Sequence, residues 1–201
     1  MITLIDYGMG NLGSLENMIK KVGGEARITS DPEVLLNSEK LILPGVGHFD
    51  HAMKKIKESG IFDALNVVVK KKKRPLLAIC LGAQLVTGSS EEGTEKGFGW
   101  VKGKTVKFQL DKKYRIPHMG WNDVEIKKKS HLFKDIPNEP CFYFVHSFHL
   151  TVENREDILT ETEYGYCFTS AIEHENIFAL QYHPEKSHKF GMSVMKNFVE
   201  L

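Results

Sequence analysis

The first eighty residues repeat one pattern, in which a short apolar run ends at a turn rich in glycine or small residues and helical spacing follows. The runs lie at residues 2–6, 40–43 and 76–79. The last of them, LLAI, is apolar throughout, as is typical of a strand buried on both faces. Strands that alternate with helices predict a parallel sheet with helices on both sides. We also expect a strand at 25–29 and helices over 12–22, from 30–32 onward and over 52–68.

After about residue 100 the chain changes to short strand-like runs with few helical stretches between them. These runs lie at 104–108, 123–126, 141–146, 167–172 and 177–182. The segment His174-Glu175-Asn176 predicts a hairpin turn between the last two runs, and residues 188–199 predict a closing helix. No linker or internal repeat divides the sequence. We therefore expect one α/β domain over residues 1–201, with a mostly parallel central sheet flanked by helices and with antiparallel strands added in the C-terminal half.

The composition excludes several classes of protein. The 201 residues include 27 Lys or Arg and 26 Asp or Glu, so the basic excess of a dedicated nucleic-acid binder is missing. No stretch approaches the roughly 18 consecutive apolar residues of a membrane span. Three widely spaced cysteines predict a reducing, cytoplasmic setting, and no pair of Cys or His has the spacing of metal ligands. We expect neither a metal nor a cofactor.

One basic run, Lys70–Arg74, needs a separate interpretation. Cations are favourable at the negative end of a helix dipole, so we interpret the run as a solvated helix end. A phosphate-binding or partner-binding patch is the alternative.

The segment from Leu76 to Leu85 carries the strongest chemical signal. A buried strand runs into Cys80, and the small residues Ala78 and Gly82 lie two positions before and after it. Small flanks suit the sharp strand-to-helix turn of a nucleophile elbow, here with sulfur in place of a serine oxygen. Such a turn also places Cys80 at a helix N-terminus, where the dipole favours a thiolate. The alternative is an inert cysteine in the core.

A possible base and its orienting group follow the last apolar run, in His183-Pro184-Glu185. If that strand continues, His183 and Glu185 are two residues apart and point to the same side. A carboxylate beside an imidazole fixes its tautomer and stabilises its cation, as in a catalytic triad. A surface His–Glu pair is the alternative, and the elbow cysteine is what favours the triad.

A nucleophile of this kind also needs donors for an oxyanion. The loop Pro44-Gly45-Val46-Gly47 follows a buried strand and carries little side-chain bulk, so its N–H groups can approach a substrate closely. We expect the donors to come from Val46 and Gly47 and from Leu81, the residue after the nucleophile. Without the cysteine, an ordinary strand-to-helix turn would be preferred.

Taken together, these motifs resemble the class I glutamine amidotransferases. The loop PGVG, the segment ICLGAQL (79–85) and HPE occur in the order of that family. Four further segments resemble one branch of it, the HisH-type glutaminase subunits of imidazole glycerol phosphate synthase. They are DYGMGN (6–11), PHMGWN (117–122), FVHSF (144–148) and HPEKS (183–187). The resemblance covers essentially the whole chain.

The resemblance implies that Cys80 attacks the side-chain amide of glutamine, His183 carries protons and Glu185 orients it. It also implies a set of residues that surround the glutamine. These are Gly45, Gln84, Glu92, His146, Ser147 and Phe148. Glu92 would pair with the substrate ammonium, and donors near Ser147 would hold its carboxylate. Without the resemblance, Glu92 would be interpreted as part of a polar loop.

The resemblance further implies a heterodimer with a HisF-type cyclase barrel. That subunit takes the ammonia and forms imidazole glycerol phosphate and an aminoimidazole carboxamide ribotide, a step of histidine biosynthesis. The residues that match the interface are Asn11, Met119, Trp121 and Lys186. A tryptophan suits the centre of an interface, although a core position for Trp121 is an equal alternative from the sequence alone.

The sequence departs from the usual pattern of this branch at Ala78, Ala83, Thr87-Gly88 and His149. These departures resemble a divergent group whose HisH-like chains supply ammonia for sugar amidination in surface-polysaccharide pathways. That acceptor stays open as an alternative to histidine biosynthesis. A non-catalytic regulatory subunit and a different cysteine hydrolase are the alternatives of another class. The intact triad disfavours the first, and the intact glutamine-site segment disfavours the second.

Overall fold

The computed structural model describes all residues, 1–201, and centres on a ten-stranded sheet. Five neighbouring strands of this sheet are parallel. In spatial order they are β2 (Ala26–Thr29), β1 (Ile2–Ile5), β3 (Lys40–Leu43), β4 (Leu76–Ile79) and β12 (Ile177–Leu180). The three apolar runs of the first half and the expected strand at 25–29 are thus strands of one parallel sheet, as predicted, and the last run of the chain joins them.

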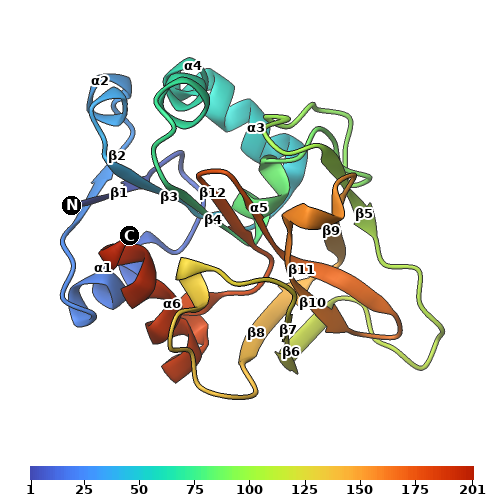
Figure 1. Cartoon of the computed structure of the whole chain (residues 1–201). Helices are drawn as coiled ribbons and strands as arrows, with labels where there is room; N and C mark the ends of the chain where they lie inside the picture. The colour runs from blue at the N-terminus through green and yellow to red at the C-terminus, as the bar shows by residue number, and fades with distance from the viewer.

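Helices cover both faces of the parallel strands (Figure 1). One face carries α2 (Pro32–Leu36), α3 (Phe49–Glu58) and α4 (Ile61–Asn66), and the other carries α1 (Leu12–Lys21) and α6 (His188–Glu200). Within β4, Leu76 and Ala78 pack toward the first group, whereas Leu77 and Ile79 pack toward the second. Because successive side chains of a strand point to opposite faces, an apolar run with no polar residue is what this double cover requires.

The C-terminal half extends the sheet with antiparallel strands, as expected. Next to β12 lie β11 (Cys167–His174), β10 (Ile158–Glu163) and β7 (Glu125–Ile126), while β9 (Phe148–Val152) pairs with both β11 and β5 (Gly103–Lys107). A separate ribbon consists of β6 (His118–Asp123) and β8 (Cys141–His146). The predicted hairpin is confirmed, because β11 ends at His174 and β12 begins at Ile177. The fold class is thus the predicted mixed α/β sheet.

Three predictions for this half were wrong. The run 123–126 is not one strand, since β6 ends at Asp123 and β7 begins at Glu125, in different sheets. The strands β9 and β10, and β6 before Asp123, were not predicted. In β10, the sequence ILTETE looks polar, yet Thr160 and Thr162 are buried and both hydroxyls hydrogen-bond to Ser170 at 2.8 Å. Finally, β12 ends at Leu180 rather than at 182.

The basic run follows α4, where a π-helix (Val67–Lys71) ends. Lys70 donates to the Trp100 carbonyl, Lys72 donates to the Leu36 carbonyl at 2.6 Å, and Lys73 pairs with Glu175. These contacts agree with the helix-end interpretation, because the fold itself uses three of the lysines.

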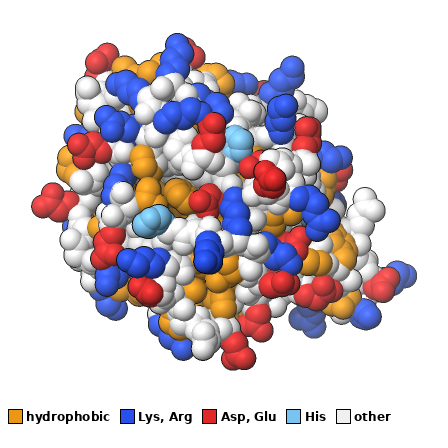
Figure 2. All heavy atoms as spheres, viewed as in Figure 1, with side chains coloured by type: hydrophobic (Ala, Val, Ile, Leu, Met, Phe, Trp, Pro, Cys, Tyr) orange, Lys and Arg blue, Asp and Glu red, His pale blue; other side chains and the backbone are white.

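The molecular surface mixes charges of both signs. Figure 2 shows acidic and basic side chains interspersed over the face seen in Figure 1, which agrees with the near-zero net charge. None of the helices has both the length and the hydropathy that crossing a bilayer requires.

Register places three loops at one edge of the sheet. Ala78 of β4 lies opposite Leu43 of β3 and Ala179 of β12, so all three strands end within one or two residues of one another. In a parallel sheet, the crevice outside the carboxyl ends of the strands is where ligands bind. The loop 44–47, Cys80 and the segment 181–185 all emerge at this edge.

Candidate active site

Cys80 occupies the sharp turn between β4 and α5 (Leu81–Leu85). Its φ of 54° and ψ of −110° lie outside the regions that non-glycine residues usually adopt, at a cost of about 1–3 kcal/mol. The Cys80 N–H donates to the Leu180 carbonyl at 2.7 Å, which ties the turn to the end of β12. Strain at a single cysteine on a strand end is the geometry expected of a nucleophile elbow.

Backbone packing around the elbow leaves no room for side chains. A Cβ atom on Gly82 would lie 2.0 Å from the Leu43 carbonyl oxygen, and one on Gly45 would lie 2.7 Å from the Gly82 nitrogen. The loop after β3 therefore packs directly against the first turn of α5. This contact brings the backbone of 44–47 beside the elbow, as the placement of oxyanion donors requires.

His183 and Glu185 form a buried pair, with 2.7 Å between Nδ1 of the imidazole and Oε1 of the carboxylate. The prediction that they lie together is confirmed, but its geometric reason was wrong. The strand has already ended, and Pro184–Lys186 forms a 3₁₀ helix that folds the carboxylate back onto the imidazole. Proline suits the first position of such a turn because its missing N–H is not needed there.

The turn is attached to β8 by a small set of hydrogen bonds. The His183 N–H donates to the Tyr143 carbonyl at 2.9 Å, and the Tyr143 N–H donates to the Ser187 hydroxyl at 3.0 Å. Ser187 in turn donates to the His183 carbonyl at 2.5 Å. These bonds fix where the imidazole lies relative to the cleft.

The electrostatics of the pair favour a charged imidazole. Burial acts to lower the pKa of His183, but the adjacent Cys80 thiol and the Glu185 carboxylate outweigh it and raise the pKa above its usual range. The second ring nitrogen, Nε2, is buried without a hydrogen-bond partner of normal geometry. Glu185 accepts a hydrogen bond from the protonated Nδ1. Nε2 is therefore the ring nitrogen left to exchange a proton with the thiol.

Two glutamines form a network behind the thiol, and one of them was missed in the sequence. Gln84 Nε2 donates to the Phe148 carbonyl at 3.2 Å and to Gln181 Oε1 at 3.3 Å. Gln181 is fully buried, and its Nε2 lies 4.0 Å from Cys80 Sγ. Because both N–H groups of Gln84 are used, its oxygen is the atom left to face a ligand. The only local signal for Gln181 was its place between a strand and His183.

Glu92 reaches the cleft from the loop that follows α5. Its Oε2 accepts the Phe49 N–H at the start of α3 at 2.8 Å, whereas its Oε1 forms no hydrogen bond within the chain. The carboxylate is thus held by one oxygen and open on the other. This arrangement suits an acceptor for a cationic group of a ligand.

His146 belongs to a hydrogen-bonded chain of side chains that fixes its tautomer. His146 Nδ1 lies 2.8 Å from the Phe148 carbonyl, so it is the protonated nitrogen, and Nε2 accepts from His118 Nδ1 at 3.0 Å. His118 Nε2 in turn accepts from Asn122 at 3.2 Å. Burial lowers the pKa of both imidazoles, that of His118 to about 4, so both are neutral at pH 7.

One cleft of about 410 Å³ brings most of the predicted site residues together. Those that line it are Val46, Gly47, Cys80, Leu81, Gln84, Glu92, His146, Ser147, Phe148, His183 and Lys186. Glu185 and Gly45 do not line it; the first lies behind His183 and the second packs on Gly82. Pro117 and Val145 also line the cleft and were not predicted.

The four predicted interface residues are exposed, and one of them, Lys186, also lines this cleft. Met119 is 61% exposed and Trp121 is 47% exposed, so the core interpretation of Trp121 was wrong. The Trp121 ring stacks on His188, with 5.2 Å between ring centroids. Lys186 Nζ lies 5.7 Å from the centroid of the Tyr143 ring, and the exposed Asn11 caps α1.

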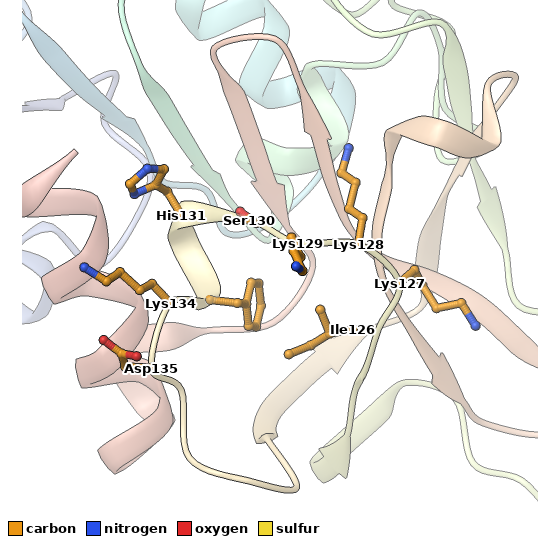
Figure 3. Close-up of a pocket in the computed structure, with 9 residues that line it drawn as sticks. Ile126, Lys127, Lys128, Lys129, Ser130, His131, Lys134 and Asp135 are labelled. Atoms are coloured by element: carbon orange, nitrogen blue, oxygen red, sulfur yellow. The ribbon is translucent and has the colours of Figure 1, made fainter.

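A larger hollow of about 910 Å³ lies elsewhere, around residues 126–135 (Figure 3). Figure 3 shows the amino groups of Lys127, Lys128 and Lys134 pointing away from one another. Lys127 pairs with Glu125 and Glu161, and Lys128 donates to the Glu156 and Glu173 carbonyls. Because these amino groups diverge and those of Lys127 and Lys128 already have partners, the hollow does not gather cations around one anion.

Comparison with known sequences agrees with this geometry. The family model described as "Glutamine amidotransferase class-I" matches residues 3–201. A relative from Methanococcus maripaludis, named imidazole glycerol phosphate synthase subunit HisH 2, is 54% identical over 100% of this chain and 99% of its own length. A protein of the same name from Pseudomonas aeruginosa is 45% identical over the full length of both chains.

Solved structures share the fold at lower identity. A glutamine amidotransferase crystal structure superposes with a TM-score of 0.69 at 18% identity, over 97% of this chain and 99% of that one. The PurLQS structure from Thermotoga maritima gives 0.71 at 15% identity, over 99% of this chain and 97% of the matched chain. With a family match over nearly every residue and full-length relatives above 40% identity, the chain belongs to the class I glutamine amidotransferase family.

Proposed function

We propose that this chain is the glutaminase subunit of a two-component synthase. In this proposal it hydrolyses glutamine to glutamate and ammonia and passes the ammonia to a HisF-type cyclase subunit. The observation that carries the proposal is the meeting of a strained elbow cysteine and a buried His183–Glu185 pair in one cleft. A regulatory subunit without chemistry would have no need for the strain at Cys80.

The first half of the reaction forms a thioester. Cys80 Sγ attacks the side-chain carbonyl carbon of glutamine, and the negative charge moves to the carbonyl oxygen. Backbone N–H groups of Val46, Gly47 and Leu81 stabilise that oxyanion. The C–N bond then breaks as His183 gives its proton to the departing nitrogen, so that ammonia leaves.

The second half returns the enzyme to its starting state. Neutral His183 takes a proton from water, which attacks the thioester carbon. The C–S bond breaks, glutamate leaves, and the sulfur is again the thiolate partner of a charged imidazole. Glu185 stays ionised throughout and holds the ring in place, as an orienting carboxylate does.

Glutamine recognition uses the remaining cleft residues. The free Oε1 of Glu92 pairs with the α-ammonium group, and the oriented oxygen of Gln84 accepts a second donor of the substrate. Gly45 supports this wall through its backbone contact with α5. The neutral His146 fixes the backbone of Ser147 and Phe148 beside the substrate carboxylate.

The acceptor of the ammonia is proposed from the relatives. Their names assign them to imidazole glycerol phosphate synthase, so we propose the cyclase reaction that yields imidazole glycerol phosphate and an aminoimidazole carboxamide ribotide, in the cytoplasm. Asn11, Met119, Trp121 and Lys186 form the docking face. Ala78, Ala83, Thr87 and His149, which depart from the usual pattern, are all buried. Gly88, the remaining departure, is half-buried. None of the five is a docking-face residue, and sugar amidation stays the alternative acceptor.

Isotope transfer tests the proposed function. The chain is mixed with a HisF-type cyclase and its ribulose-phosphate substrate, and glutamine labelled with ¹⁵N in the side-chain amide is the only nitrogen source. We expect the label in imidazole glycerol phosphate and one glutamate for each product molecule. Glutamate without labelled product would contradict the acceptor, and labelled product with a sugar-amidating synthetase instead would favour the alternative.

A second prediction concerns Glu185. Glu185→Gln keeps the size of the side chain and removes the charge that stabilises the imidazolium, so we expect kcat to fall by about 10²-fold or more. The KM for glutamine should change little, because the carboxylate does not touch the substrate. The loss should be smaller than that of Cys80→Ala. Steady-state glutamate release measures both constants, and an unchanged kcat would show that another group orients His183.

A further inference from the structure

Two consecutive residues in the first turn of α3 bind the loop that carries Glu92. One attachment is the Phe49 N–H, which donates to Glu92 Oε2. The other is Asp50, the next residue of the helix. Its Oδ2 accepts the Thr94 N–H at 3.0 Å, and its Oδ1 accepts the Glu95 N–H at 2.9 Å. One carboxylate thus accepts from two consecutive backbone donors, two and three residues after Glu92.

The Asp50 carboxylate also leaves no room for a side chain at Gly93. A Cβ atom on Gly93 would lie 1.9 Å from Asp50 Oδ1 and 2.3 Å from Asp50 Cγ. Gly93 shows no positive φ, so what it supplies here is the absence of a side chain. The residue after Glu92 must therefore be glycine for Asp50 to reach the two amides behind it.

We propose that Asp50 is a positioning residue that selects for the ammonium group of the substrate, because it holds the loop that points Glu92 into the cleft. This inference rests on the proposed function, in which Glu92 binds that ammonium. Asp50 does not line the cleft itself. It acts only through the loop, as a supporting shell does for a binding group.

Asp50 would act by restricting the conformational freedom of the loop that carries Glu92 before the substrate binds. Without Asp50, Glu92 keeps its bond to the Phe49 N–H, but the Thr94 and Glu95 N–H groups lose their acceptor and the backbone after Glu92 gains freedom. Asp50 removes that freedom before glutamine binds, so that binding does not have to order the loop. The two amide donors hold the pKa of Asp50 below its usual range, so the carboxylate is ionised at pH 7 and both oxygens accept.

The test compares two ligands on a chain that cannot turn over. In the Cys80→Ala chain, isothermal titration measures the Kd of glutamine and of glutaramate, which is glutamine without its α-ammonium group. Asp50→Ala is then added. We expect the Kd of glutamine to rise about tenfold, and that of glutaramate to change less than about twofold. Gly93→Ala, which pushes the carboxylate away, should give the same selective loss.

Two further variants act as controls. Lys57→Ala removes another contact between α3 and the same loop, its ion pair with Glu95, without touching Asp50 or the backbone donors. It should leave both Kd values unchanged. Asp50→Asn keeps one accepting oxygen and should give an intermediate loss. It also keeps the first turn of α3 intact if the alanine variant fails to fold.

The outcomes separate the inference from the function on which it rests. Equal weakening of both ligands, or no weakening of glutamine, in the folded Asp50 and Gly93 variants would overturn the positioning role while leaving the glutaminase proposal intact. A Cys80→Ala chain with Asp50 present that binds neither ligand would instead overturn the proposed function itself.

Discussion

Replacing Cys80 with alanine is expected to abolish glutamine hydrolysis, lowering kcat by at least about 10⁴-fold. The reason is chemical, because the substitution removes the sulfur atom that forms the acyl intermediate. Gln181, whose Nε2 lies 4.0 Å from that sulfur, is an amide and cannot take over its role. The same variant should still support the synthase reaction of its complex when ammonia is supplied in excess. Glutamate release and product formation, measured on one preparation, check both halves of the prediction.

The chain offers matched controls for this experiment in its other two cysteines. Cys141 and Cys167 lie outside the cleft, at the beginnings of β8 and β11. Cys141→Ala and Cys167→Ala should therefore retain nearly full activity. Appreciable glutaminase activity in Cys80→Ala, or its loss in either control, would contradict the assignment of the nucleophile.

The second large effect is expected from the partner. The isolated chain should be a poor glutaminase, and binding of the cyclase with an acceptor analogue should raise kcat/KM by about one to two powers of ten. Free ammonia is lost to protonation, so hydrolysis is useful only when an acceptor is present. The candidate for the switch is the loop 44–47, whose glycines permit two backbone arrangements of similar energy. In one arrangement an N–H faces the oxyanion, and in the other a carbonyl does.

A continuous set of contacts joins the proposed docking face to this loop. Asn11 directly follows Gly10, where an added Cβ would lie 3.0 Å from Pro44 Cβ. An added Cβ on Gly47, whose φ is 101°, would lie 3.0 Å from the terminal carbon of Met9. A partner that binds at Asn11 can therefore favour one arrangement of the loop through its different affinity for the two.

The steady-state glutaminase rate of the chain alone, of the complex, and of the complex with the acceptor analogue tests this coupling. Trp121→Ala combined with Lys186→Ala should reduce the activation, because both side chains are exposed on the proposed docking face and Lys186 also lines the cleft. A free chain as fast as the full complex would contradict the coupling. Full activation of the double variant would contradict only the proposed docking face.

The parallel half of the fold could be predicted from the sequence because its strands, apart from the edge strand β2, are buried on both faces. Burial of that kind leaves apolar runs such as LLAI at 76–79, and the turns that end them contain the glycines that the backbone contacts require. The strand β10 could not be recognised, since its buried face uses the hydroxyls of Thr160 and Thr162. Their partner, Ser170, belongs to another strand, so no local pattern records the pairing.

The same distinction applies to the candidate site. Cys80, His183 and Glu185 could be predicted because each has a local pattern that its chemistry demands. Even so, the His–Glu contact arises from a 3₁₀ turn and not from a continuing strand. Gln181 and Asp50 could not be predicted, because their contacts reach residues about 100 and 45 positions away along the chain. Their roles depend on where the fold places them.

The central claim is that glutamine hydrolysis passes through a thioester on Cys80. Acid quenching during turnover, followed by peptide mapping with mass spectrometry, locates any acyl group directly. We predict a glutamyl group on the peptide that contains Cys80, at a level that falls to zero in Cys80→Ala. Steady glutamate production with no acyl group on Cys80, or with the group on Cys141 or Cys167 instead, would contradict the account.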